Sequence, residues 1–342
     1  MPGSEDSTGE AGGTPAAPRA HVMQCMEVWG GNEAADNAVT MPGLQTWVLS
    51  RPYRGEASGG DIHYLSSCMT GRITRLLVAD VSGHGASVSD VANTLRRLMR
   101  KYVNYIDQRR FVTDMSREFG ELAQAGRFAT AVAATYWGPT GEFVACNAGH
   151  PRPLWYRSAA KEWSVLGEAG RARRTARADQ SGPSNLPLGL DAGEPPRYDE
   201  LRVRLAPDDL VLLYTDSVTE SRDAGGRLLG ERGLLDLVRT LDPSRPAELI
   251  PGIVAALAGR SGVDAGAISG ASDDDLTLLL LRRTRDGPRM TMHDKLVGLA
   301  QYGRKAVDAI RGGSDHPFPW PELTLRNIGG AFIRAFNGRA ER

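Results

Sequence analysis

Residues 73–85 read ITRLLVADVSGHG, a run of apolar and branched side chains that stops at an aspartate and a glycine-rich turn. A short apolar run bounded by turn residues is typical of a buried strand. Two similar runs occur later in the chain, DLVLLYTD at 209–216 and DDLTLLLL at 274–281. Their apolar parts are continuous rather than alternating, which predicts strands that are covered on both faces.

The other predicted elements indicate the fold class. A hairpin is expected where RFATAVAATYW and GEFVACNAGH flank a Gly-Pro-Thr-Gly turn, residues 127–150. Shorter strands are expected in MEVWGG (26–31), LQTWVLSRP (44–52), PLWYR (153–157) and ELRVRL (200–205). Apolar residues at helical spacing predict helices over 86–106, 111–126, 230–241 and 246–260, the last with a kink at Pro251. This order lacks a regular βαβ alternation, so it predicts an α+β fold arranged as an α/β sandwich.

The composition argues against several classes of function. The 342 residues include 41 Lys and Arg and 41 Asp and Glu, without the basic excess that a sequence-independent nucleic-acid binder needs. The cysteines, Cys25, Cys68 and Cys146, form neither a C-x-x-C zinc pair nor a disulfide framework. The N-terminus lacks the pattern of a secretory signal, and no apolar run approaches the ~20 residues of a membrane-spanning helix. We therefore expect a cytoplasmic protein without nucleic-acid or membrane partners.

Three regions are predicted along the chain. Residues 1–20 are mainly Gly, Ala, Pro, Ser and Thr, and are expected to form a disordered tail. A folded domain is expected over 21–284, followed by a C-terminal extension, 285–342, with one amphipathic helix at 290–310. Within the domain, residues 159–185 are polar and lack periodicity, which predicts either a mobile loop or a flap that faces the substrate.

Four aspartates fall at the ends of predicted strands. Asp61 follows two glycines, Asp80 ends the first apolar run, Asp216 ends the second, and Asp274 precedes the third. A single aspartate in such a position is usually a turn residue or a helix cap. Several buried carboxylates together are unfavourable unless cations compensate them. Oxygen ligands without a cluster of Cys or His favour Mg²⁺ or Mn²⁺ over zinc.

A set of short motifs makes this pattern more specific. In chain order they are GGD (59–61), DVSGHG (80–85), NAGHP (147–151), YTDSVTE (214–220) and DDLT (274–277). Together they resemble the SpoIIE/RsbU-type branch of the PPM, or protein phosphatase 2C-like, serine/threonine phosphatases, over roughly residues 40–283. The resemblance implies two mainly antiparallel β-sheets flanked by helices, with a site for two ions, Mn²⁺ or Mg²⁺, at one end.

The resemblance also implies a set of metal ligands. They would be Asp80, which bridges both ions, Asp61 and the backbone carbonyl of Val81 on one side, and Asp216 and Asp274 on the other. Water would fill most of the remaining coordination positions, which suits Mg²⁺ and Mn²⁺.

Two assignments in this site have alternatives. Asp274 stands three residues before Thr277, as the family pattern D-[DN]-x-T requires, but Asp273 and Asp275 are open to the same role. His84 could donate a proton to the leaving alkoxide, or it could make only a local hydrogen bond.

Two departures from the family pattern leave the ligands in place. Ser217 stands where glycine is usual, and Ile62 and His63 stand where an aromatic residue commonly follows the first aspartate. Asn147 and His150 are expected to shape a loop near the site.

The implied function is hydrolysis of phosphoserine or phosphothreonine on a protein, by a water activated between two metal ions. Relatives of this type often act on small STAS-domain anti-anti-sigma proteins, so a STAS-type phosphoprotein is the implied partner. The alternative is a non-catalytic module, a pseudophosphatase, that binds a phosphoprotein in a partner-switching pathway. Regulation is expected in trans, through a partner or a homodimer.

Overall fold

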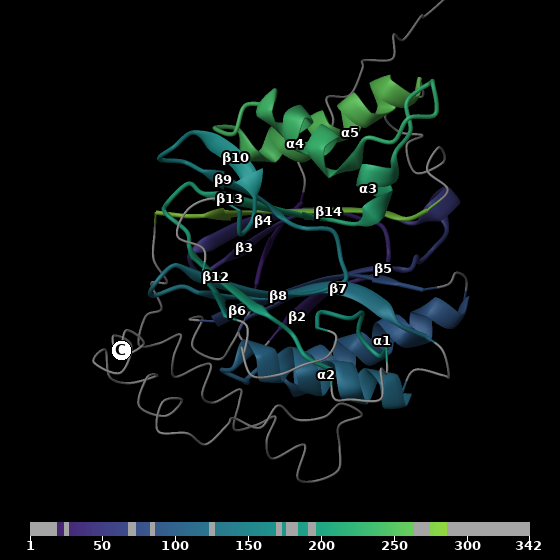
Figure 1. Cartoon of the computed structure of the whole chain (residues 1–342), viewed down its shortest axis with the longest axis vertical. Coiled ribbons are helices and arrows are strands. Elements are labelled where there is room, and N and C mark those ends of the chain that lie inside the picture. The colour runs from purple at the N-terminus through teal and green to yellow at the C-terminus, as the bar shows by residue number, and fades with distance from the viewer. Residues whose placement is uncertain are drawn as a thin grey trace, which may run out of the picture.

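Two β-sheets lie face to face in the computed structural model, with helices on both outer surfaces (Figure 1). The structure describes residues 19–23, 27–67, 73–82, 86–122, 127–168, 173–175, 184–190, 196–262 and 274–285. The prediction of an α+β sandwich is confirmed.

The first sheet is antiparallel except at one edge. Its strands, in spatial order, are β1 (Arg19–Val22), β3 (Ala35–Met41), β4 (Leu44–Arg51), β14 (Leu276–Arg283), β13 (Leu210–Tyr214), β9 (Leu154–Arg157) and β10 (Glu162–Val165). The pair β1–β3 is parallel. The last described strand, β14, pairs with β4 on one side and β13 on the other, so it lies in the middle of the sheet.

The second sheet is antiparallel throughout its described strands. Their spatial order is β11 (Arg173–Thr175), β12 (Glu200–Arg204), β8 (Glu142–Ala148), β7 (Ala129–Trp137), β6 (Ile73–Val81), β5 (Asp61–Ser67) and β2 (Val28–Gly31). The predicted hairpin is confirmed as β7–β8, and Gly141 closes its turn with a φ of 71°, a conformation that favours glycine.

Helices cover the outer face of each sheet (Figure 1). On the second sheet lie α1 (Ala86–Lys101) and α2 (Gln108–Leu122), and on the first lie α3 (Asp216–Glu220), α4 (Gly230–Arg239) and α5 (Pro246–Ser261). A short 3-10 helix, η1, spans Tyr53–Gly55. Pro251 lies inside α5, which continues through it as one helix. No helix among the described residues has the length and apolar content to cross a membrane.

The continuous apolar runs arise because each central strand meets apolar layers on both faces. In β6, Leu76 and Val78 lie in the layer between the sheets, while Leu77 and Ala79 lie in the layer beneath α1 and α2. The β14 side chains alternate in the same way between the inner layer and the layer beneath α4 and α5. Since neighbouring strand residues point to opposite faces, both sets must be apolar.

Some boundaries differ from the sequence expectations. The polar stretch 159–185 is not one loop, because β10 and β11 lie within it, and the Trp163 and Val165 side chains of β10 are buried. Two inward side chains in a four-residue strand give too short a period to stand out in the sequence. The first helix ends at Lys101 rather than at 106, and Asp216 begins α3 rather than ending a strand.

Several expectations lie outside the described residues. These are almost all of the predicted N-terminal tail, the amphipathic helix at 290–310, His84 and Asp273.

The antiparallel pairing places four strand ends at one end of the sandwich. β5 begins where β6 ends, and β13 ends where β14 begins. The two pairs come from different sheets, and the backbone at Gly60 and Asp61 hydrogen-bonds to Asp275, just before β14. The segments that carry the four predicted aspartates therefore meet.

Candidate metal centre

Asp61 and Asp80 form one half of the site. They stand directly opposite each other on β5 and β6, and the Val81 amide next to Asp80 donates to the Gly60 carbonyl at 3.2 Å. Asp61 is only 3% exposed, whereas Asp80 is half-buried. The pairing of neighbouring strands thus holds two carboxylates side by side at the end of the second sheet.

The first sheet supplies the hydrogen bond that orients Asp61. The Thr215 hydroxyl, just after β13, donates to Asp61 Oδ2 at 2.8 Å. That hydroxyl in turn accepts the Thr277 amide at 2.9 Å, and Thr277 Oγ1 lies 3.1 Å from Ser50 Oγ. These contacts connect one carboxylate to three strands of the opposite sheet, so its position depends on both sheets.

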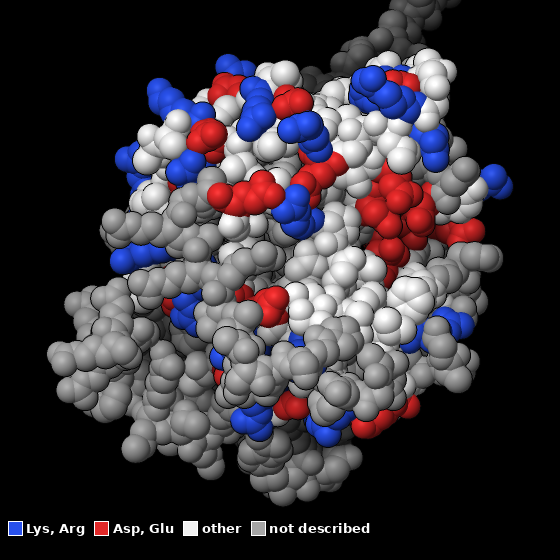
Figure 2. Space-filling model, in the orientation of Figure 1, with Lys and Arg blue, Asp and Glu red and all other residues white. Residues whose placement is uncertain are grey.

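Asp216 and Asp274 form the other half, at the ends of β13 and β14. The Thr215 amide next to Asp216 donates to the Thr277 carbonyl at 3.1 Å, which continues the pairing of these strands toward the site. Figure 2 shows a patch of acidic side chains beside α3, on the face where these strands end. All four predicted aspartates thus lie in one region.

The electrostatics of this region are those of carboxylates that repel one another. Burial and the negative charges of Asp216, Asp274, Asp275 and Glu220 raise the pKa of Asp80 to about 7. Burial, and next the charge of Asp80, hold the pKa of Asp61 well above its ordinary value. The pKa values of Asp216 and Asp274 are also raised, first by burial. A divalent cation would relieve this repulsion.

Glu220 is a fifth carboxylate that sequence reasoning missed. It lies one helical turn after Asp216 on α3, and its negative charge raises the pKa values of both Asp216 and Asp80. The i, i+4 spacing of the two acids in DSVTE is the signal that could have identified it, because such residues face the same side of a helix.

Asp274 and Asp275 have different surroundings although they are neighbours. The Asp275 carboxylate is 8% exposed and accepts backbone N–H groups, including that of Tyr53 at 2.6 Å. Asp274 is influenced by the charge of Asp216. The charges of both residues raise the pKa of Asp80, and that of Asp275 also raises the pKa of Asp61, so the two neighbours differ chiefly in the backbone N–H groups that Asp275 accepts.

The loop of Asn147 and His150 lies next to β7, the strand that pairs with the Asp80 strand. The Asn147 side chain donates to the His150 carbonyl and accepts the His150 amide, both at 2.8 Å. His150 Nδ1 lies 2.8 Å from Thr130 Oγ1, and Thr130 is directly opposite Asp80 on β7. Burial lowers the pKa of His150 to about 3, so this ring is neutral at neutral pH. It is a structural neighbour of the site, as the sequence predicted.

The Ser217 side chain lies beside the threonine that orients Asp61. It is buried, and Ser217 Oγ lies 3.4 Å from Thr215 Oγ1. The extra hydroxyl therefore joins the threonine contacts that orient Asp61.

The donor set fits hard divalent cations. The members of this set are carboxylates and the backbone carbonyls at the end of β6. The described residues contain no cluster of cysteine or histidine side chains that could hold a metal ion. No three His, Cys, Asp or Glu side chains in the described parts of the chain already enclose a single ion site. Water and backbone oxygens would therefore complete each coordination shell, which Mg²⁺ and Mn²⁺ accept readily.

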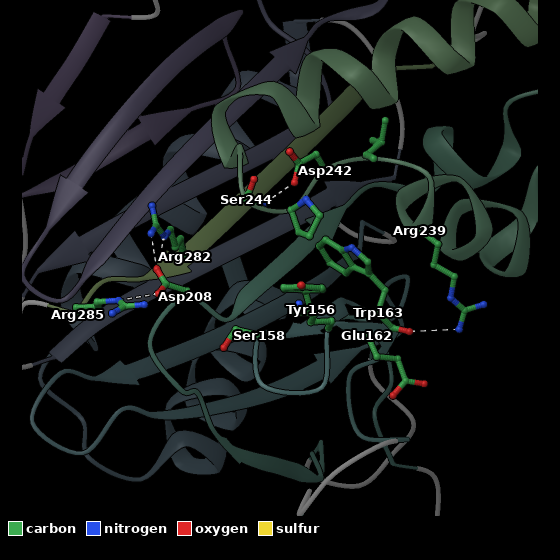
Figure 3. A pocket seen from close by; sticks show the side chains of 13 residues that line it. Tyr156, Ser158, Glu162, Trp163, Asp208, Arg239, Asp242, Ser244, Arg282 and Arg285 are labelled. Carbon is green, nitrogen blue, oxygen red and sulfur yellow. Dashed lines mark hydrogen bonds and ion pairs between the residues drawn. The ribbon is translucent and has the colours of Figure 1, made fainter.

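A cavity of about 850 Å³ lies elsewhere, at the opposite end of β13 and β14 (Figure 3). Its lining includes Tyr156, Trp163 and several charged residues. Arg282 and Arg285 both point to Asp208, with Nε–O distances of 3.0 and 2.9 Å. Because this carboxylate is already neutralised by two guanidinium groups, the cavity is a poor candidate for a cation site.

Comparison with known proteins identifies the family. The family model described as Stage II sporulation protein E (SpoIIE) matches residues 70–284, well over half of the chain. The chain belongs to the SpoIIE family. The matched range includes three of the four predicted aspartates, Asp80, Asp216 and Asp274, while Asp61 precedes it.

Solved structures similar to this SpoIIE-family chain share its fold. The RsbU and RsbW domains of a Mycobacterium tuberculosis protein match at a TM-score of 0.55 and 23% identity, covering 80% of this chain and 70% of that one. The SiaA-PP2C domain of Pseudomonas aeruginosa matches at 0.53 and 18%, covering 69% and 84%. The phosphatase domain of Bacillus subtilis SpoIIE matches at 0.51 and 15%, covering 74% and 98%. The chain therefore has the PP2C-type phosphatase fold.

We predict that Thr215→Val weakens metal binding by this SpoIIE-family protein. Valine keeps the shape but removes the donor to Asp61 and the acceptor for the Thr277 amide. Loss of a hydrogen bond that orients a ligand is expected to raise the Kd for Mn²⁺ roughly 10- to 100-fold, measured by calorimetric titration. The control is Thr46→Val, because Thr46 is equally buried but lies toward the far end of β4. Equal Kd values for Thr215→Val and wild type would contradict the role given to Thr215.

Proposed function

We propose that the protein is a metal-dependent protein serine/threonine phosphatase. The observation that carries this proposal is the carboxylate cluster of Asp61, Asp80, Asp216 and Asp274 at one end of the sandwich, with pKa values raised by burial and by repulsion from neighbouring carboxylates. Membership of the SpoIIE family and the PP2C-type fold support it. Two ions, Mn²⁺ or Mg²⁺, would be held between the two halves of the cluster.

Each of the clustered residues has a proposed role as a metal ligand. Asp80 stands opposite Asp61 in one half, and the charges of Asp216 and Asp274 in the other half raise its pKa, so it is the natural bridging ligand. Asp61 and the Val81 carbonyl would complete one side. When bound, two divalent ions lower the pKa of a shared water and neutralise the oxygens of a phosphoryl group. No covalent nucleophile is needed, because phosphoryl transfer depends mainly on positioning and charge neutralisation.

His84 is the proposed donor of a proton to the leaving alkoxide. It stands four positions after Asp80 in the sequence, outside the described residues. The alternative role, a local hydrogen bond, would leave the leaving group to take its proton from water.

The proposed substrate is a phosphoserine or phosphothreonine protein of bacterial signalling, of the STAS type. The support is the similarity to a Mycobacterium tuberculosis chain that contains both an RsbU and an RsbW domain. The proposed setting is the cytoplasm, and a homodimer is the proposed form if regulation works by self-association. The second candidate function is a pseudophosphatase that only binds the phosphoprotein. The presence of all four carboxylates disfavours it.

The test is hydrolysis of a phosphoserine and a phosphothreonine peptide with Mn²⁺, with Mg²⁺ and with a chelator. Wild type is expected to release phosphate only with metal, and Asp216→Asn to lose most of that activity. Asp236→Asn on α4 is the matched control, because Asp236 is an exposed aspartate paired with Arg239. Wild-type turnover no higher than that of Asp216→Asn would favour the binding module instead.

A further inference from the structure

Asp275 joins two segments that belong to different sheets. Its Oδ1 accepts the Tyr53 amide at 2.6 Å, and its Oδ2 accepts the Gly60 amide and, at 3.4 Å, the Asp61 amide. Asp275 immediately precedes β14 of the first sheet, whereas Asp61 is the first residue of β5 in the second. One buried carboxylate therefore ties the start of one central strand to the start of another.

The segment that Asp275 contacts is shaped to receive it. A Cβ on Gly59 would lie 2.3 Å from Asp275 Oδ1 and 2.6 Å from Oδ2, so only glycine leaves room for the carboxylate. Gly59 itself is fixed by Asn32, whose side-chain amide donates to the Gly59 carbonyl at 2.9 Å and whose carbonyl accepts the Gly59 amide at 2.8 Å. The Asp275 carboxylate thus contacts a segment that is already held from its other side.

The neighbours of this contact are two of the proposed metal ligands. Asp61 donates its own amide to Asp275, and Asp274 precedes Asp275 and accepts the Asp275 amide on Oδ1 at 2.9 Å. Any change in the position of Asp275 must therefore change the separation of Asp61 and Asp274, which lie in opposite halves of the site.

We propose that Asp275 is a positioning residue that fixes the spacing between the two halves of the metal centre and does not itself bind metal. This inference rests on the proposed function and gives a different role to Asp275, which the sequence left open as a metal ligand. A carboxylate suits the task because both of its oxygens accept hydrogen bonds. Asparagine would offer one acceptor and would turn an NH₂ group toward a backbone N–H.

The structure contains a matched control at the far end of β13. Asp209 is a buried aspartate whose carboxylate also accepts backbone amides, those of Ser158 at 2.8 Å and Ala206 at 2.9 Å. It lies at the end of the strand away from Asp216. Asp209→Asn should therefore repeat the local damage of Asp275→Asn without touching the metal centre.

The experiment measures Mn²⁺ affinity by calorimetric titration and Tm in chelator, for the full chain and its variants. Asp275→Asn is expected to raise the Kd for Mn²⁺ roughly 10- to 100-fold and to lower Tm by about 2–4 °C. Asp209→Asn is expected to lower Tm by a similar amount and to leave the Kd unchanged. Asp274→Asn is expected to weaken Mn²⁺ binding more than Asp275→Asn, without lowering Tm in chelator, because asparagine keeps the Oδ1 that accepts the Asp275 amide.

A second variant keeps the test decisive if Asp275→Asn fails to fold. Gly59→Ala changes no charge and no polar group but displaces the same carboxylate, so it should raise the Kd as Asp275→Asn does. An unchanged Kd in a folded Asp275→Asn or in Gly59→Ala overturns the proposal. So does an Asp275→Asn that loses Mn²⁺ as completely as Asp274→Asn with no fall in Tm, since Asp275 would then be a ligand. A wild type that binds no Mn²⁺ contradicts the proposed function itself, before any variant is compared.

Discussion

Asp80→Asn is expected to reduce phosphatase activity by about 10³-fold or more, because several kcal/mol of transition-state stabilisation would be lost with the bridging ligand. Among the predicted ligands, Asp80 alone both pairs with Asp61 across β5 and β6 and has its pKa raised by the charges of Asp216 and Asp274. The measurement is kcat/KM on a phosphoserine peptide at saturating Mn²⁺.

Asp209→Asn is the control for this loss, because it removes a buried aspartate far from the metal centre. It should lower activity only as far as it lowers the folded fraction. Activity of Asp80→Asn within tenfold of wild type would contradict the bridging role.

Asp80→Asn is also expected to stabilise the metal-free protein at alkaline pH. The pKa of Asp80 in the folded state is about 7, well above its ordinary value of 3.8. The folded state therefore holds a proton that the unfolded state releases between these pH values, and its stability falls as the pH rises through that window. Between pH 5 and pH 8 the loss from Asp80 amounts to about 2–3 kcal/mol. Asparagine carries no such charge, so the variant escapes the loss.

The measurement is urea unfolding of wild type and Asp80→Asn in chelator at pH 5 and pH 8. The difference between the two proteins is the quantity to compare, because burial lowers the pKa values of His63 and His150 to about 4 and about 3. Those rings make both proteins more stable as the pH rises toward 6.5, in the sense opposite to Asp80. If the variant gains nothing over wild type between pH 5 and pH 8, the carboxylates do not repel one another as described. Mn²⁺ should remove the advantage of the variant.

Much of this candidate site could be predicted from the sequence, because its aspartates lie next to strand ends that the sequence pattern identifies. Asp61, Asp80 and Asp216 each adjoin a strong apolar run or a glycine pair, and antiparallel pairing brings such ends together without knowledge of the sheet order. The continuous runs correctly predicted strands covered on both faces, since only a strand between two apolar layers has apolar residues at every position.

The parts that could not be predicted depend on the direction of single side chains. Asp274 and Asp275 have the same chemistry and adjacent positions, yet only Asp275 reaches the amides of η1 and the Gly60 turn. Side chains that alternate along extended backbone cannot be assigned to a side without the register of the partner strands. Glu220 was missed because α3 is too short to give a helical period.

The central place of β14 has a consequence for the synthesis of the protein. Residues 276–283 emerge from the ribosome after every other described strand, yet they separate β4 from β13 in the finished sheet. Until they arrive, those two strands have no partner between them, and Asp275, whose carboxylate contacts the Gly60 amide of the other sheet, is only just being added. Because chains are made from the N-terminus onward, a nascent polypeptide lacks the assembled carboxylate cluster until its last described strand is in place. Acquisition of metal would thus report that the whole domain has been completed.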